Sequence, residues 1–180
     1  MSDKPIELFV SWSRKDKLLK NALIGSLEDH LGIIEGLTFS LWQDVELAVG
    51  LDWDEQLQQR LAGCDYGLLL LSPSFFSSVY IRERELSWFT GTTGKPMLPV
   101  MLRQVPLDGS RRTGGVELRQ IFHDPLHHRA FADARDRDAF ARELAEAIRR
   151  RVLSDRAGSP PTWGVMSWPT GDSPSEAAGA

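Results

Sequence analysis

One carboxylate on an otherwise apolar helical face is the strongest candidate for chemistry in this sequence. Residues 75–90 have the composition of a helix, and Glu85 lies near its middle. At about 100° per residue, the side chains that share its narrow sector are Ile81, Trp88 and Phe89. Burying an unpaired charge is costly, so this carboxylate must pair with a cation, take up a proton or face a cleft. Arg14 and Arg103 are the candidate cations for a purely structural ion pair.

Polar residues also follow the ends of the expected strands, where ligands bind in open parallel sheets. Those that follow the first three strands are Ser11, Trp12, Ser13 and Arg14, then Gln43 and Asp44, then Ser72. The chain contains neither G-x-G-x-x-G after its first strand nor G-x-x-x-x-G-K-[ST]. A Rossmann dinucleotide cradle and a P-loop are therefore not expected.

The remaining reactive side chains favour structural roles. His123, His127 and His128 lie close together, but Pro125 interrupts them, so a surface loop is favoured over a metal site. Cys64 is the only cysteine, which excludes an intramolecular disulfide and favours packing over nucleophilic chemistry. No metal is expected.

Strands and helices alternate along the chain. The expected strands are residues 6–10, 37–42, 66–71, 96–102 and 118–122. The expected helices are residues 15–31, 52–62, 75–90 with a potential break at Ser77 and Ser78, and 136–153. This alternation predicts an α/β fold with a mostly parallel, five-stranded sheet flanked by helices. The apolar run at 66–71 is typical of a strand buried on both faces, and Pro99 indicates an edge strand or an irregularity.

Composition sets the class of protein. The chain has 180 residues, of which 42% are hydrophobic and 26% charged, which predicts one soluble domain at residues 1–156. A net charge of −4 disfavours direct nucleic-acid binding. The longest aliphatic run, residues 68–71, is too short to span a membrane, and the N-terminus has no signal-peptide core, so a cytoplasmic location is expected.

Residues 157–180 differ from the rest of the chain. They are rich in Ala, Gly, Ser, Pro and Thr and contain neither Lys nor Arg. Such a segment cannot build its own core, so we expect a disordered or docking tail. Its docking residues would be Trp163, Val165, Met166 and Trp168.

Four segments, in their order and spacing, resemble a Toll/interleukin-1 receptor (TIR) domain of the bacterial kind. They are residues 8–13, residues 41–44 with Gly50 and Trp53, residues 68–73, and residues 80–86 with 94–100. The resemblance covers roughly residues 6–153 and implies a flavodoxin-like TIR fold. This chain has Val49 where the loop after the second strand usually has Pro.

Many bacterial and plant TIR domains cleave NAD+ at the nicotinamide–ribose bond with a helical glutamate, and Glu85 matches that position. NAD+ is then a substrate, and no cofactor is implied. Trp42 matches an aromatic residue that stacks on the nucleotide, and Asp44 matches an acid that shapes the cleft. The positions that match the cleft lining near the first strand are Ser11, Trp12 and Arg14. The offset from Tyr80 to Glu85 is one residue longer than in plant members, which makes Glu83 a minor rival.

The resemblance implies an NAD+ glycohydrolase or cyclase that acts as an effector or signal generator in antiphage defence. It implies self-association through TIR–TIR contacts, and we expect a separate sensor protein to supply the trigger. The alternative is a non-enzymatic TIR module that recruits partners. A receiver-like domain is disfavoured because no acidic cluster follows the first strand.

Overall fold

The computed structural model describes residues 4–43, 53–90 and 94–158 of the chain. Four parallel strands form one sheet in the order β2-β1-β3-β4. The strands are β1 (Ile6–Ser11), β2 (Phe39–Trp42), β3 (Tyr66–Leu71) and β4 (Met97–Met101). The expected α/β fold with a parallel sheet is confirmed, and Pro99 lies in an edge strand as its missing N–H requires.

The expected fifth strand is reduced to a single bridge. A short 3-10 helix occupies Val116–Leu118, and after it only Phe122 pairs with β4. The Phe122 N–H donates to the Pro99 carbonyl at 2.8 Å, and the Met101 N–H donates to the Phe122 carbonyl at 2.9 Å. Because Pro99 offers no donor, the outer edge of β4 supports a shorter ladder than an ordinary strand would. Among the described residues the sheet therefore has four strands, and the predicted count of five was wrong.

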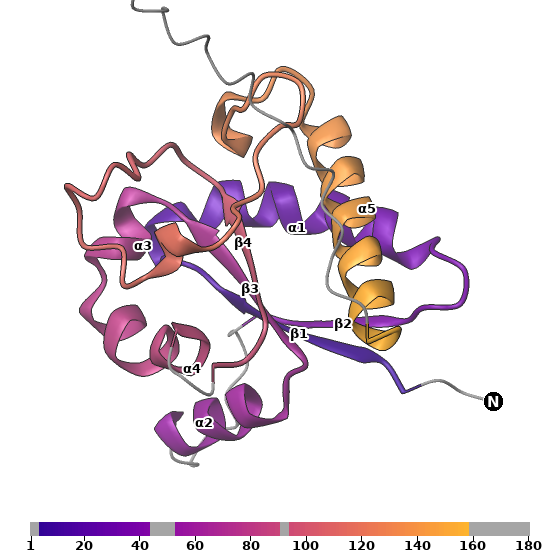
Figure 1. Ribbon diagram of the computed structural model, residues 1–180, viewed down its shortest axis with the longest axis horizontal. Helices are drawn as coiled ribbons and strands as arrows, with labels where there is room; N and C mark the ends of the chain where they lie inside the picture. Colours follow the sequence, from indigo (N-terminus) through magenta and orange to yellow (C-terminus); the bar gives the residue numbers. More distant parts are fainter. Residues whose placement is uncertain (1–3, 44–52, 91–93, 159–180) are drawn as a thin grey trace, which may run out of the picture.

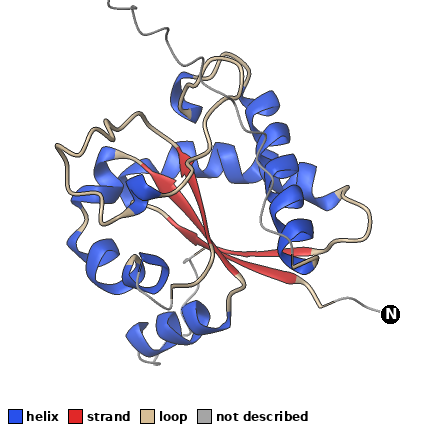
Figure 2. Cartoon of the chain, in the orientation of Figure 1, coloured by secondary structure: helices blue, strands red, loops and turns tan. Residues whose placement is uncertain are grey.

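Helices cover both faces of the sheet (Figures 1 and 2). One face carries α1 (Lys17–Gly32) and α5 (Arg137–Arg156), which pack against each other. The other face carries α2 (Trp53–Gly63), α3 (Pro73–Ser77) and α4 (Ser87–Thr90). Two further 3-10 helices span Arg14–Asp16 and Phe131–Asp133. No helix in the described ranges is both long and apolar enough to cross a bilayer.

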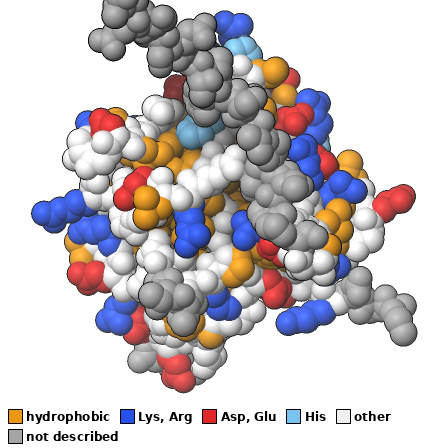
Figure 3. Space-filling model, in the orientation of Figure 1, with side chains coloured by type: hydrophobic (Ala, Val, Ile, Leu, Met, Phe, Trp, Pro, Cys, Tyr) orange, Lys and Arg blue, Asp and Glu red, His pale blue; other side chains and the backbone are white. Residues whose placement is uncertain are grey.

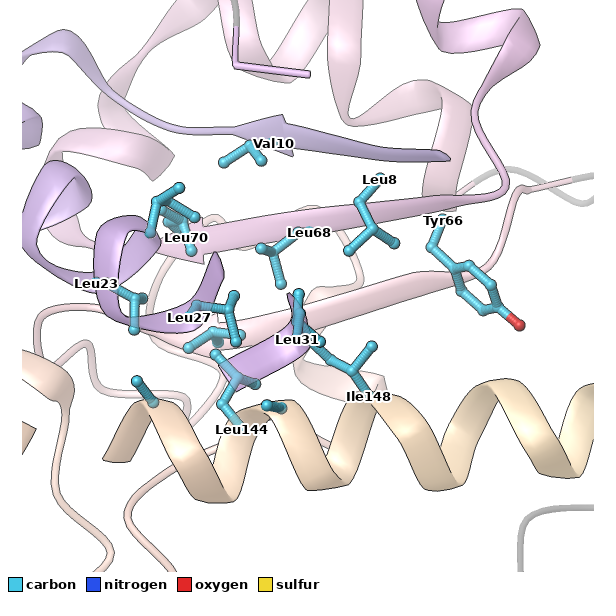
Figure 4. Packing of buried hydrophobic residues seen from close by; sticks show 14 of the residues in the cluster. Leu8, Val10, Leu23, Leu27, Leu31, Tyr66, Leu68, Leu70, Leu144 and Ile148 are labelled. Atoms are coloured by element: carbon cyan, nitrogen blue, oxygen red, sulfur yellow. The ribbon is translucent and has the colours of Figure 1, made fainter. Parts of the chain in front are cut away.

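The period-two alternation of the strands divides the core between these faces. Leu8 and Val10 of β1 join Leu68 and Leu70 of β3 in the cluster beneath α1 and α5, as Figure 4 shows. The next residue along β1, Phe9, faces the cluster beneath α2, α3 and α4 together with alternate residues of β3. Every residue of β3 is buried, which confirms the prediction of a strand covered on both faces.

The segment expected as one helix at 75–90 is divided into three pieces. Ser72 caps α3 by accepting the Phe75 N–H at 3.0 Å, and α3 ends at Ser77, because the backbone of Ser78 is extended. A π-helical turn follows at Ile81–Glu85 and leads into α4. The break therefore falls where the two adjacent serines indicated it.

Gly67 of β3 sets how closely α4 approaches the sheet. A Cβ atom at this position would lie 2.3 Å from Cε1 of Phe89, so only glycine allows the ring to rest on the strand. This contact anchors α4, and the preceding π turn is placed by it.

Candidate functional site

Glu85 and Ser11 meet at the C-terminal edge of the sheet. Glu85 closes the π turn with its side chain buried at 5% exposure, and Ser11, the last residue of β1, is equally enclosed. The Ser11 hydroxyl donates a hydrogen bond to Oε2 of Glu85. A strand end and a helical turn 74 residues later in the chain therefore hold one buried carboxylate between them.

The π turn presents Glu85 to the sheet. The Leu86 N–H donates to the Ile81 carbonyl at 2.8 Å, five residues back instead of four, and Ser78 Oγ accepts the Ile81 N–H at 3.3 Å. A π turn holds one residue more than an α turn. Both Ile81 and Glu85 are buried, whereas Glu83, the rival carboxylate, is exposed.

A second buried carboxylate, Asp16, lies at the same edge and was not predicted. Asp16 is 3% exposed, accepts the Ser72 hydroxyl at 2.5 Å and pairs with Nη1 of Arg103 at 3.3 Å. Three strand ends are thus joined, because these residues follow β1, β3 and β4. Arg103, considered from sequence as a partner for Glu85, pairs with Asp16. The available signal was an acid close behind the first strand, in the polar stretch Ser13–Asp16.

Trp42 lies on the same face of the sheet as Ser11. The register pairs Trp42 of β2 with Phe9 of β1. Ser11 lies two residues after Phe9 on β1, about 7 Å further along that strand. The Trp42 ring stacks on Phe9 with centroids 5.1 Å apart, and the Arg60 guanidinium lies 5.8 Å from its centroid. A cavity of about 220 Å³ lies beside these three side chains. Trp42 is half-buried, so part of its surface is available to a ligand.

Trp12 lies on the opposite face and is not brought together with Glu85. It packs against the cluster beneath α1 and α5, and the Lys20 ammonium lies 4.4 Å from its ring centroid. Lys20 is buried, and it donates to Oε1 of Gln43 at 3.0 Å. Desolvation lowers the pKa of Lys20, and the positive charge of Lys17 lowers it further. The hydrogen bond between Lys20 and Gln43 therefore links α1 to the residue that follows β2.

Arg14 and Asp44 are the other two predicted site residues. Arg14 begins the 3-10 helix after β1, is exposed, and forms no ion pair with any residue that the structure describes. Its guanidinium is therefore available to an anion at this edge of the sheet. Asp44 lies outside the described residues, as does most of the loop between β2 and α2.

The histidines and the cysteine do not form a centre. Within the ranges 4–43, 53–90 and 94–158, no three His, Cys, Asp or Glu side chains are placed to hold a metal ion. His123 Nδ1 lies 3.1 Å from the Ile121 carbonyl, whereas His127 Nδ1 lies 3.2 Å from a carboxylate oxygen of Asp124. Cys64 is buried, and this burial raises the pKa of its thiol.

Comparison with known proteins identifies the family. The sequence pattern of the TIR domain matches residues 8–144, which is more than half of the chain, and the chain belongs to the TIR domain family. Among solved structures, it is similar to the TIR domain of the Toll-related receptor TRR-2 from Hydra magnipapillata, with a TM-score of 0.51 and 15% identity. That match covers 79% of this chain and 97% of the other, and it shows a shared fold. No curated protein sequence matched.

Proposed function

We propose that this TIR domain cleaves NAD+ at the nicotinamide–ribose bond, with Glu85 as the catalytic carboxylate. The observation that supports the proposal is the buried Glu85 carboxylate, held by Ser11 at the C-terminal edge of a parallel sheet. A domain that only recruits partners has no physical need for an acid among Ile81, Leu86 and Phe89, since its burial is costly.

The chemistry requires a negative charge beside the ribose. The bond between ribose C1′ and the nicotinamide nitrogen breaks, the electron pair leaves with nicotinamide, and the ribose becomes oxocarbenium-like. The Glu85 carboxylate stabilises that positive charge. Water then adds to C1′ and loses a proton, which yields ADP-ribose. Attack by a group on the adenosine half of the same molecule would instead yield a cyclic product.

The burial of Glu85 implies regulation of this activity. At 5% exposure, the carboxylate reaches a substrate only when the π turn and its neighbours move apart. TIR domains generally associate through TIR–TIR contacts, and such contacts are the natural source of that movement. Specific activity therefore rises with protein concentration or on contact with a separate sensor. A role as an effector or signal generator in antiphage defence fits an NAD+-consuming enzyme that is held inactive until triggered.

The test compares Glu85→Gln with Glu83→Gln in a nicotinamide-release assay over a range of protein concentrations. Gln keeps the shape and a hydrogen-bond acceptor but removes the charge. We expect Glu85→Gln to lose about 100-fold or more of the activity with the fold intact by circular dichroism. Glu83→Gln, the exposed neighbour, retains wild-type turnover.

Two results would contradict the proposal. Full activity in Glu85→Gln, together with an inactive Glu83→Gln, would transfer the role to Glu83. Absence of turnover in protein that demonstrably self-associates would instead favour a non-enzymatic recruiting module.

A further inference from the structure

A groove of about 950 Å³ opens along the outer edge of β4, and the proposed chemistry does not use it. Its walls are β4, residues 118–128 and the side of α5 that bears Ala147 and Arg151. None of Glu85, Ser11 or Trp42 lines it. We call this feature the β4 groove. It occupies the place where a fifth full strand was expected.

The β4 groove exposes apolar surface. Leu118 lines it and is 83% exposed, and Leu98 of β4 lines it with its side chain partly exposed. In the view of Figure 3, hydrophobic and basic side chains lie close together over β4 and α5. Apolar surface gathered in a groove and bordered by charge is typical of a binding surface.

The charge at the rim of the groove is mainly positive. Its basic lining residues are Lys95, Arg119, Arg150 and Arg151, and its acidic lining residue is Glu143. Arg150 and Arg151 are compensated by ion pairs within α5. The Lys95 ammonium donates to two backbone carbonyls at 2.7 and 2.6 Å, and neither Lys95 nor Arg119 forms an ion pair with a residue that the structure describes. The rim therefore favours an acidic or neutral occupant over a basic one.

We propose that the occupant is the chain's own segment Trp163–Trp168. This segment supplies two indole rings, Val165 and Met166, and residues 159–180 contain Asp172 and Glu176 but neither Lys nor Arg. Its apolar side chains match the exposed leucines, and its charge matches the basic rim. Each buried indole removes about 150–250 Å² of surface from water.

The length and exit of the chain allow this docking. α5 forms one wall of the groove and ends at Arg156, after which Gly158 adopts φ +67 and turns the chain out of the helix. From Arg151 at the rim to Arg156 is about 8 Å of helix. The five residues from Gly158 to Trp163 span up to about 17 Å when extended. The segment therefore reaches back to the groove.

The docking is through side chains, because β4 offers little to an added strand. Pro99 has no N–H, and Phe122 already bonds the Pro99 carbonyl and the Met101 N–H. Leu118 and Leu98 are therefore the contacts on which the docking depends.

The test uses the full chain labelled with 5-fluorotryptophan and observed by ¹⁹F NMR. Trp163→Phe and Trp168→Phe assign the two tail resonances. We expect the chemical shifts of both tail resonances to differ from their values in denaturant. We also expect both indole rings to be protected from relaxation by a soluble gadolinium chelate. Leu118→Glu should move both tail resonances to their chemical shifts in denaturant and raise the relaxation enhancement by the chelate several-fold. Leu18→Glu, which changes a leucine that is 86% exposed at the start of α1, should leave both unchanged.

The resonances of Trp12, Trp42 and Trp88 report in the same spectra that each variant is folded. Tail resonances at the denatured position in the wild-type chain would overturn the proposal, as would resonances insensitive to Leu118→Glu in a folded variant. Shielding that appears only as protein concentration rises would overturn docking within one chain and assign the groove to the tail of a second copy.

Discussion

The Trp42 ring packs on Phe9 and lies near the Arg60 guanidinium, so the effects of its substitution on stability and on substrate binding must be separated. If the nucleotide base stacks on its available face, Trp42→Ala weakens NAD+ use by about 1–3 kcal/mol, whereas Trp42→Phe keeps a ring and most of the activity. The measurements are KM for NAD+ and melting temperature for each variant. A loss of melting temperature that parallels the loss of activity in both variants would make Trp42 a core residue only.

Single residues were predictable where a local pattern carried the information. Glu85 stands out because it interrupts an apolar stripe within one turn of helix, and its burial is confirmed. The burial of Asp16 and Lys20 was not predictable, because both lie in a polar stretch that looks solvated. The partners that enclose Asp16, Ser72 and Arg103, are 56 and 87 residues away in sequence. Only the parallel sheet brings them together.

At the scale of elements, the Ser72 hydroxyl both caps a helix and hydrogen-bonds a buried carboxylate. Its Oγ caps α3 and also donates to the buried Asp16. Ser72→Ala should lower the free energy of unfolding by about 1 kcal/mol for the lost cap and by about 1–3 kcal/mol more for the weakened Asp16. Chemical denaturation measures this change.

The matched control for Ser72 is Asp136→Ala in α5. Asp136 caps that helix by accepting the Ala139 N–H at 2.9 Å and is exposed. It should cost only the cap, about 1 kcal/mol. Equal losses in the two variants would show that the Ser72–Asp16 hydrogen bond contributes nothing to stability.

Element type was more predictable than element extent. The four strands and the helices α1, α2 and α5 begin and end within about three residues of the expected bounds, because each has strong periodicity or a strong apolar run. The π turn within 75–90 depends on a contact that sequence does not display, the seating of Phe89 on Gly67. The reduction of the fifth strand was not predicted, although Pro99, which lacks an N–H, is visible in the sequence.

At the scale of the whole molecule, α1 and α5 are joined by a polar clamp as well as by their shared core. Asp138 at the start of α5 accepts the Ser26 hydroxyl at 2.7 Å and lies 2.9 Å from His30 Nε2. The Ser26 hydrogen bond, then that of His30, holds the pKa of Asp138 below its usual value of 3.8.

A depressed carboxyl pKa contributes stability that is present above the unfolded value and is lost as pH falls through the folded one. Asp138→Ala should therefore reduce the fall in melting temperature between about pH 5 and pH 2. Asp29→Ala, at an exposed position of α1, serves as the control. An acid profile of Asp138→Ala identical to that of wild type would exclude the clamp as a source of pH dependence.

The π turn at Ile81–Glu85 gives this domain tolerance to changes in chain length beside its candidate carboxylate. Because the turn holds one surplus residue, deletion of the exposed Glu83 should convert it into an α turn. Glu85 then stays next to Leu86, and Phe89 stays on Gly67. We expect this deletion to cost only a few degrees of melting temperature and to preserve nicotinamide release.

Deletion of the exposed Arg142 in α5 is the contrasting case. It rotates every later residue by about 100° and turns Leu144 and Ile148 away from the core, so that variant should not fold. If the Glu83 deletion were equally damaging, the π turn would be a fixed requirement of the fold. If the Glu83 deletion is tolerated, insertions and deletions can accumulate at this turn among relatives while the carboxylate keeps its position. Counting residues from the position of Tyr80 would then assign the wrong residue as the counterpart of Glu85.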